Sequence, residues 1–147
     1  MNSKNKHKKM NSDRYTCDYK TIRIGGKLYR YVSLDTVMDY GLYALVNMNV
    51  LEIPEIKYRK TLIKILEELP KHGYLPEDDF NSSGISDTYA SEIDMLKTFD
   101  LIRPSSDFLI VIDKKKFMKM FEKVYKRIDQ KLLDIVRSYF EKWVQEK

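Results

Sequence analysis

The sequence predicts a mainly α-helical fold of the α+β class, with an N-terminal β-hairpin, a helical core and a long C-terminal helix. Two β-type runs flank a Gly-Gly pair, and apolar residues recur every three or four positions over 34–48 and 56–69. The segment 114–147 contains neither Gly nor Pro. We therefore expect a mobile basic tail at 1–20, a core at 21–113 and an amphipathic helix at 114–147.

The segment TIRIGGKLYRYV predicts the hairpin, because a two-residue Gly-Gly loop suits type I′ and II′ turns. Such a loop pairs Ile22 with Tyr29. The face that should then pack on the core comprises Ile22, Ile24, Tyr29 and Tyr31. The opposite face is partly cationic, and its Arg23 and Arg30 either contact phosphate or face solvent.

Two helices should follow the hairpin. Ser33 is a suitable N-cap, Gly41 weakens the prediction of one continuous helix, and Pro54 breaks the chain. The apolar positions of the first helix are Leu34, Val37, Met38, Leu42, Leu45 and Met48. Those of the second, which Pro70 and Gly73 end, are Tyr58, Leu62, Ile65, Leu66 and Leu69. A strand before two helices also fits a ribbon-helix-helix, although the break between the helices is long for that motif.

From Tyr58 to Asp113 the chain reads as an amphipathic helix, a short segment, a helix over 86–99 and a second hairpin, LIRPSSDFLIVID. This order resembles a winged helix-turn-helix. The residues that carry the resemblance are Pro76, which would open a short second helix, Gly84 in the turn, and Ile85, Ala90, Ile93 and Leu96. Ser105, Ser106 and Asp107 would form the wing tip before a strand at 108–112. Dimeric regulators of the MarR and PadR types are similar, and the resemblance implies that helices outside the DNA-reading unit form a dimer interface.

If Ile93 is the centre of the buried face, the outward ridge of helix 86–99 is uncharged and suits the base edges of a major groove. The predicted base-reading residues on this ridge are Thr88, Ser91 and Met95. Asp87, Glu92 and Asp94 flank the ridge and oppose phosphate, so cations must come from elsewhere. The candidates for backbone contacts are Arg103, Lys114, Lys115, Lys116, Lys8, Lys9, Arg23 and Arg30.

The C-terminal segment carries an apolar stripe that repeats after eleven residues, a period typical of a nearly straight helix. The stripe comprises Phe117, Phe121, Val124, Ile128, Leu132, Ile135, Tyr139 and Trp143. A stripe this long must be covered, and we expect a second copy to cover it in a homodimer. The alternative is a monomer in which the helix folds back on its own core. The opposite face is basic, and its interspersed acids favour a solvated face over a membrane surface.

Composition bounds the remaining classes. The net charge is +5, with six bases and two acids in 1–20 and eleven bases and five acids in 114–147, so the middle of the chain is acidic. Cys17, His7 and His72 are too few for a zinc site. The longest apolar run is five residues and no signal-peptide pattern follows the basic N-terminus, so we expect an intracellular, cytoplasmic chain without a membrane partner.

No catalytic constellation is recognisable, and we expect no enzyme, no metal and no cofactor. Gly25, Gly26 and Lys27 lack the rest of a phosphate-binding loop, and the acids at 77–79 suit a helix N-terminus. The sequence favours a homodimeric winged-helix protein that binds double-stranded DNA and acts as a transcriptional regulator or as a plasmid- or virus-type regulator. The alternative is a protein-interaction module whose acidic helix binds a basic partner from transcription or replication machinery.

Overall fold

The computed structural model describes residues 20–77 and 84–145, which form five α-helices, one 3₁₀ helix and six strands. This arrangement confirms the α+β class. In chain order the elements are β1 (Thr21–Ile24), β2 (Lys27–Val32), α2 (Leu34–Asn47), β3 (Glu52–Pro54), α3 (Glu55–Glu68), η1 (Leu69–His72), β4 (Tyr74–Pro76), α4 (Gly84–Thr98), β5 (Ile102–Ser105), β6 (Phe108–Val111), α5 (Lys114–Val124) and α6 (Gln130–Gln145).

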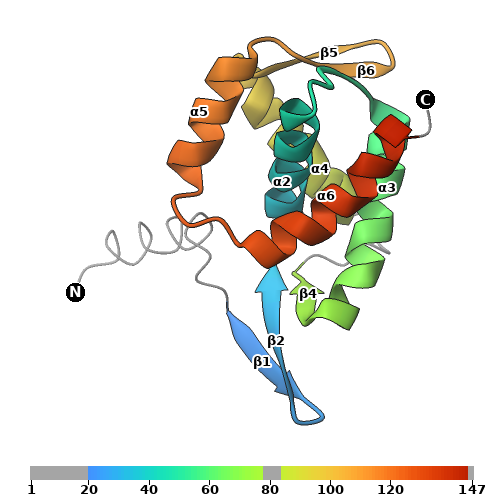
Figure 1. Cartoon of the computed structure of the whole chain (residues 1–147), viewed down its shortest axis with the longest axis vertical. Coiled ribbons are helices and arrows are strands. Elements are labelled where there is room, and N and C mark those ends of the chain that lie inside the picture. Colours follow the sequence, from blue (N-terminus) through green and yellow to red (C-terminus); the bar gives the residue numbers. More distant parts are fainter. Residues whose placement is uncertain (1–19, 78–83, 146–147) are drawn as a thin grey trace.

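Helix α2 forms the centre of the core, with α3, α4, α5 and α6 packed around it (Figure 1). Eleven of its fourteen residues are buried, which explains why its apolar pattern covers more than one face. The predicted core positions of α2 and α3 are confirmed, apart from Met48, which is half-buried just after α2 ends. Gly41 does not interrupt α2; it lets α6 approach closely, because a Cβ there would lie 2.8 Å from Cε2 of Phe140.

Two three-stranded sheets lie at opposite ends of this helical body (Figure 1). One has the order β3-β6-β5 and is antiparallel throughout. The other has the order β1-β2-β4, and β4 runs parallel to β2 with Val32 opposite Pro76. The prediction that Pro76 opens a short helix is therefore wrong. The chain turns at Gly73, whose φ is 87°, and the backbone N–H of Arg30 then donates to the Gly73 carbonyl at 2.9 Å.

The N-terminal hairpin has the predicted register, with Ile22 opposite Tyr29. Its predicted packing is wrong: Ile22 and Ile24 are 37% and 52% exposed, and β1 is exposed along its whole length. Only the base of the hairpin joins the core, through Val32. The rest projects beyond the helices, so that within residues 20–77 and 84–145 no core covers β1 (Figure 1).

The predicted single C-terminal helix is also wrong, because the chain leaves the helical conformation between α5 and α6. No Gly or Pro marks this break in the sequence. Two tertiary contacts hold it instead: the buried Tyr125 hydroxyl donates to Oδ2 of Asp39, and the Asp129 N–H donates to the Tyr40 hydroxyl at 3.0 Å. These contacts outweigh the local preference for a continuous helix, which is a weak determinant when side chains are buried.

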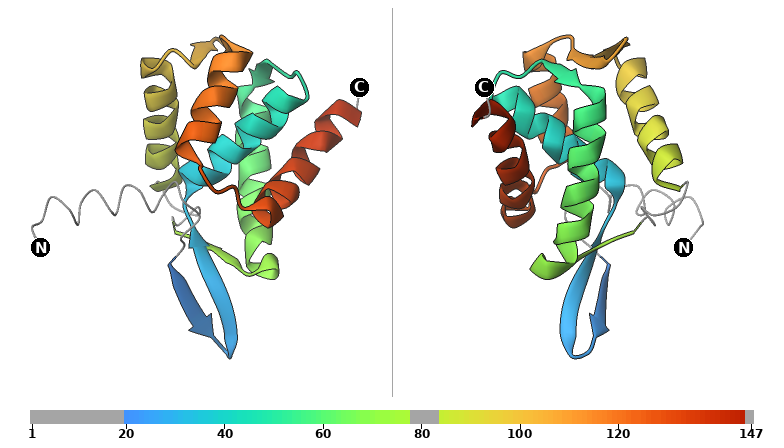
Figure 2. Two further views of the ribbon diagram at one scale, coloured as in Figure 1. Left: turned by 60° about the vertical axis from the view of Figure 1, so that its left-hand side comes forward. Right: turned by 90° about the vertical axis from the view of Figure 1, so that its right-hand side faces the viewer.

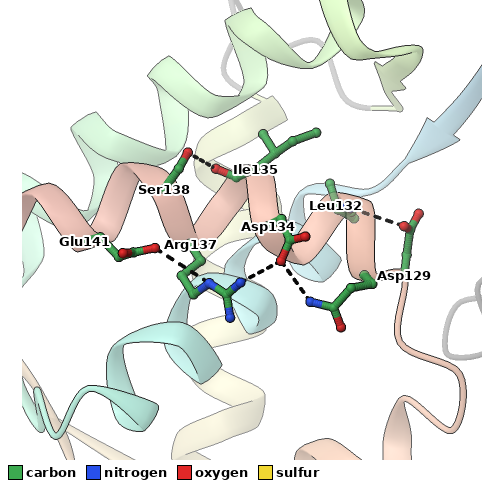
Figure 3. A network of polar contacts seen from close by, with 8 residues as sticks. Asp129, Leu132, Asp134, Ile135, Arg137, Ser138 and Glu141 are labelled. Atoms are coloured by element: carbon green, nitrogen blue, oxygen red, sulfur yellow. Dashed lines mark hydrogen bonds and ion pairs between the residues drawn. The ribbon is translucent and has the colours of Figure 1, made fainter.

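Asp129 also starts α6. Its Oδ1 accepts from the backbone N–H of Leu132 at 3.1 Å, the bond expected of an N-capping aspartate, and its Oδ2 accepts from the Tyr74 hydroxyl at 2.7 Å. The exposed face of α6 is internally paired. Arg137 lies 2.6 Å from Asp134 and 3.6 Å from Glu141, so cations and carboxylates neutralise one another there (Figure 3).

The contact of α4 with α3 centres on Tyr89, whose hydroxyl donates to Oε2 of Glu55 at 2.9 Å beneath the guanidinium of Arg59. Its neighbour Tyr58 is fully buried and donates to the Met38 carbonyl at 2.7 Å. Burial raises the pKa of both phenols well above the ordinary value, and the nearby carboxylates raise it further; Arg59 opposes this shift at Tyr89. Both side chains therefore stay neutral in the folded protein.

We predict that Gly41→Ala lowers the free energy of unfolding by about 1–3 kcal/mol, because the Phe140 ring it meets is itself packed against Tyr58 and Trp143. At an unobstructed helix position the same change stabilises by up to about 1 kcal/mol, so the sign is diagnostic. Chemical denaturation measures it. Phe140→Leu should lower the free energy of unfolding less in the Gly41→Ala background than in the wild type. A Gly41→Ala variant that is more stable than the wild type would contradict the close approach.

We predict that the protein loses stability as pH rises above about 10, the ordinary tyrosine pKa. Below that pH the folded and unfolded states both keep the phenol protons; above it only the unfolded state releases those of Tyr58 and Tyr89. Denaturant unfolding at several alkaline pH values should show this loss, with a smaller pH dependence in Tyr58→Phe. Tyrosinate absorbance that reaches completion before the protein unfolds would contradict it.

Candidate nucleic-acid interface

Helix α5 presents a face of lysines to solvent. Lys115, Lys116, Lys119 and Lys123 are all exposed, and at 100° per residue they fall within about 100° of arc. Phe117 and Phe121 occupy the opposite side and are completely buried against the core. Sequence position alone fixes this separation, since lysine and phenylalanine each recur at a four-residue spacing.

Carboxylates in the described part of the chain do not pair with these lysines. Within residues 20–77 and 84–145, none of the four forms a salt bridge, in contrast to the paired arginine of α6. The charge continues past the helix, because 115–127 holds six bases and one acid, with Lys126 and Arg127 both exposed beyond α5. We call the exposed lysines of α5, Lys115, Lys116, Lys119 and Lys123, the α5 basic face.

The β1–β2 hairpin is the second basic surface. Residues 20–32 contain four bases, Lys20, Arg23, Lys27 and Arg30, and no acid. All four are exposed, and in the described part of the chain none of them forms a salt bridge. Arg23 contacts the Gly26 carbonyl at 3.4 Å, and Lys27 lies 5.2 Å from the Tyr29 ring, so both side chains are held along the ribbon.

Helix α5 and the hairpin are connected through the start of α6 (Figure 1). Figures 1 and 2 show α5 leading down through 125–129 to the start of α6, near the end of β2 from which the hairpin projects. Contacts fix that junction: Lys131 donates to the His72 carbonyl at 2.9 Å, and Tyr74, which bonds Asp129, lies opposite Arg30 in the sheet. The two surfaces therefore lie one after the other along the long axis of the molecule.

Helix α4 does not present the predicted ridge. Its buried positions are Tyr89, Glu92 and Leu96 rather than positions centred on Ile93, which is only half-buried. This rotation half-buries Thr88 and Met95, two of the three predicted base-reading residues, and leaves Ser91 exposed. Asp87 and Asp94 are exposed and lie within about 20° of the direction that points straight away from the core.

One flank of α4, with exposed as well as half-buried residues, lines an acidic pocket of about 310 Å³ against the first turn of α2. Its walls carry three carboxylates from two helices, and the lining residues are Asp35, Asp87, Thr88, Ser91, Glu92 and Met95. The sequence predicts an uncharged ridge that enters a DNA groove, but the structure has at this place a surface that repels phosphate. The burial of Glu92, at 3% exposure, is what sequence periodicity missed, since a glutamate is rarely fully buried.

The predicted backbone-contacting residues fall into three places. Arg103 and Lys114 to Lys116 lie at the same end of the molecule, because the register pairs Ile102 with Val111 just before α5 begins. There Lys114 is half-buried and donates to Asn49 Oδ1, whereas its two successors are exposed. Arg23 and Arg30 lie at the other end, in the hairpin. Lys8 and Lys9, like Asp78 and Asp79, lie outside the described residues.

The β5–β6 turn, which the sequence predicts as a wing tip, is short and is bonded to the start of α3. Ser106 has a φ of 50°, and the Asp107 carbonyl accepts from the backbone N–H of Glu55 at 2.9 Å. The β5–β6 hairpin is thereby fastened to the start of α3 and does not project. The basic residue of this hairpin, Arg103 in β5, is exposed.

The predicted dimer stripe lies largely within one chain. Phe117, Phe121, Leu132 and Trp143 are at most 8% exposed, so the core of the same chain already covers them, and their assignment to a dimer interface is wrong. The other four, Val124, Ile128, Ile135 and Tyr139, are half-buried against that core. The stripe is covered because α5 and α6 fold separately onto α2, and α6 buries Val136 and Phe140 as well.

Residues 20–77 and 84–145 hold no group of three or more His, Cys, Asp or Glu side chains arranged to bind a metal ion. Among the helices they form, none has the length and apolar content needed to cross a membrane.

Comparisons with known proteins add no family assignment: no protein-family model, no curated protein and no solved structure matches the chain.

Proposed function

We propose that this chain binds double-stranded DNA, as a regulator of transcription must, and that the α5 basic face supplies its main phosphate contacts. The observation that carries the proposal is the row of exposed lysines on α5, none of which pairs with a carboxylate among the described residues. Clustered bases that lack local counter-charges gain most from phosphate, since each contact releases condensed counterions.

The order of elements supports the same function. Helix α2, strand β3, helices α3 and α4, and the β5–β6 hairpin follow one another as in a winged helix, and the strand order β3-β6-β5 is the one such a domain uses. In this correspondence α2 is the first helix and α3 the second, so the resemblance begins about twenty residues earlier than the sequence suggests. Fold alone does not determine function, and the charge distribution is therefore the stronger support.

The same distribution argues for a different mode of binding from the one the sequence favours. A recognition helix in the major groove places its outward side chains on base edges and its flanks beside phosphates. On α4 the outward side chains include Asp87 and Asp94. We propose that α4 stays outside the groove and that binding depends on the α5 basic face and the hairpin. A homodimer is not part of this proposal, since the stripe expected to form it is used within the chain.

A matched pair of variants tests the proposal. Lys119→Ala/Lys123→Ala removes two exposed lysines one turn apart on α5, and Lys60→Ala/Lys64→Ala removes two at the same spacing on α3, which lies across the molecule (Figure 1). We expect the α5 variant to bind random duplex DNA more weakly and to lower the slope of log K against log salt by about 2. Fluorescence anisotropy between about 50 and 200 mM salt measures both quantities. Equal effects of the two variants would show that total charge, not the α5 basic face, determines binding.

One observation favours a second function, a docking surface on α4 for a basic protein segment. The outward carboxylates Asp87 and Asp94 and the acidic pocket beside them match cations rather than phosphate. The charge reversal Asp87→Lys/Asp94→Lys distinguishes the two functions. If the chain binds DNA through α5, this reversal should leave the wild-type affinity unchanged or increase it. Wild-type protein that fails to bind duplex at low salt, together with a reversed variant that binds it, would instead favour the docking function.

A further inference from the structure

The β1–β2 hairpin exposes apolar side chains that its fold does not require. Ile22, Ile24 and Leu28 are 37%, 52% and 47% exposed, and they account for three of the eight large exposed apolar residues in the described part of the chain. They gather on a ribbon that also carries four bases and no acid. Apolar side chains concentrated on an exposed element are typical of a binding surface.

Near the turn the apolar side chains lie on both faces of the ribbon. The register pairs Ile24 with Lys27 and Arg23 with Leu28, so Ile24 and Leu28 belong to opposite faces. Each is paired across the ribbon with a lysine or an arginine. The end of the hairpin is thus a narrow apolar wedge with cations beside it, closed by Gly25 and Gly26 at φ values of 57° and 80°.

The base of the ribbon is firmly held. The Tyr31 N–H donates to the Lys20 carbonyl at 2.8 Å, and the Glu77 N–H donates to the Val32 carbonyl at 2.8 Å on the other edge of β2. With Val32 buried and β4 paired alongside, the ribbon leaves the body in a fixed direction (Figure 2). A ribbon that is already ordered loses little conformational entropy when it binds.

We propose that this hairpin enters a groove of double-stranded DNA and inserts Ile24 and Leu28 against the base steps, bending the duplex. The inference rests on the proposed DNA binding and specifies how the chain deforms its target. A two-stranded ribbon is of a size that DNA grooves admit, and proteins that insert aliphatic wedges between base steps kink the duplex while cations hold the phosphates on either side. Arg23, Lys27 and Arg30 are placed to hold them.

Charge and geometry favour DNA over other occupants. Pairing of β1 with a second copy would bring together two ribbons of charge +4, which repel each other. An anionic lipid surface binds elements that have one apolar face and one basic face, whereas here Ile24 and Leu28 lie on opposite faces. A groove surrounds the ribbon on both faces, so both side chains are covered at once.

The test uses the full chain and a duplex of about 30 base pairs labelled at both ends, long enough for a sharp bend to change the end-to-end distance. Energy transfer between the labels reports bending, and anisotropy over the same salt series reports affinity. The variant Ile24→Ser/Leu28→Ser keeps every charge. Its matched control, Ile56→Ser/Ile63→Ser, removes two exposed aliphatic side chains from α3.

We expect wild type and control to shorten the end-to-end distance equally, and the hairpin variant to bend the duplex little and to bind about tenfold more weakly with an unchanged salt slope. Unchanged bending by the hairpin variant overturns the inference while leaving DNA binding intact. Absence of binding by the wild type overturns both.

Vesicles of anionic phospholipid serve as the competing target, and binding to them that depends on Ile24 and Leu28 would assign the wedge to a membrane surface instead. All four residues changed are exposed, and equal thermal midpoints would confirm that the variants fold.

Discussion

The arrangement of the whole molecule depends on how the chain is held between α5 and α6. Asp39 on the central helix accepts from Tyr125, Tyr40 accepts from the Asp129 backbone, and Asp129 in turn accepts from Tyr74. Leaving a buried group in such a network without its partner costs about 1–3 kcal/mol, a large share of the stability of a small domain. These bonds turn one amphipathic segment into two helices that reach the core from different directions. Because α5 buries Phe117 and Phe121 against the core, its lysines are left exposed to solvent.

Local patterns in the sequence predict much of the fold because their signals lie within a few residues. The Gly25 and Gly26 turn determines the hairpin register, Pro54 separates α2 from α3, and the apolar spacing of α3 identifies its buried face correctly. The errors have a common origin in contacts between distant parts of the chain. Nothing near Tyr125 in the sequence indicates a partner 86 residues away, and Pro76 lies in a strand only because β2 provides an edge. An aspartate at 129 before a new apolar period was the one local sign of the break.

The candidate interface is likewise predictable from local sequence in one part and not in the other. The lysine spacing of α5 and the absence of acid in 20–32 can be read directly from the sequence, since charge on an exposed helix or ribbon follows from position. The orientation of α4 cannot, because it depends on Glu92 turning inward with Tyr89 and Leu96. A rotation of this kind brings Asp87 and Asp94 to the outermost position and changes the sign of the charge that the helix presents. Acidic and basic surfaces thus occupy different helices around α2, and a polyanion and a polycation could bind the same molecule without competing.

The parallel pairing of β2 with β4 has a mechanical consequence. It joins the hairpin to a strand that follows α3, so the projecting ribbon is anchored along the edge where β2 pairs with β4. A load applied at its tip passes through the bond between Arg30 and Gly73 to the end of α3, and through Tyr74 and Asp129 to the first turn of α6. Force on the ribbon therefore reaches α3 and α6, two of the helices that pack on α2. An object held by this arm would be coupled to the core at two points, which resists twisting better than a single hinge does.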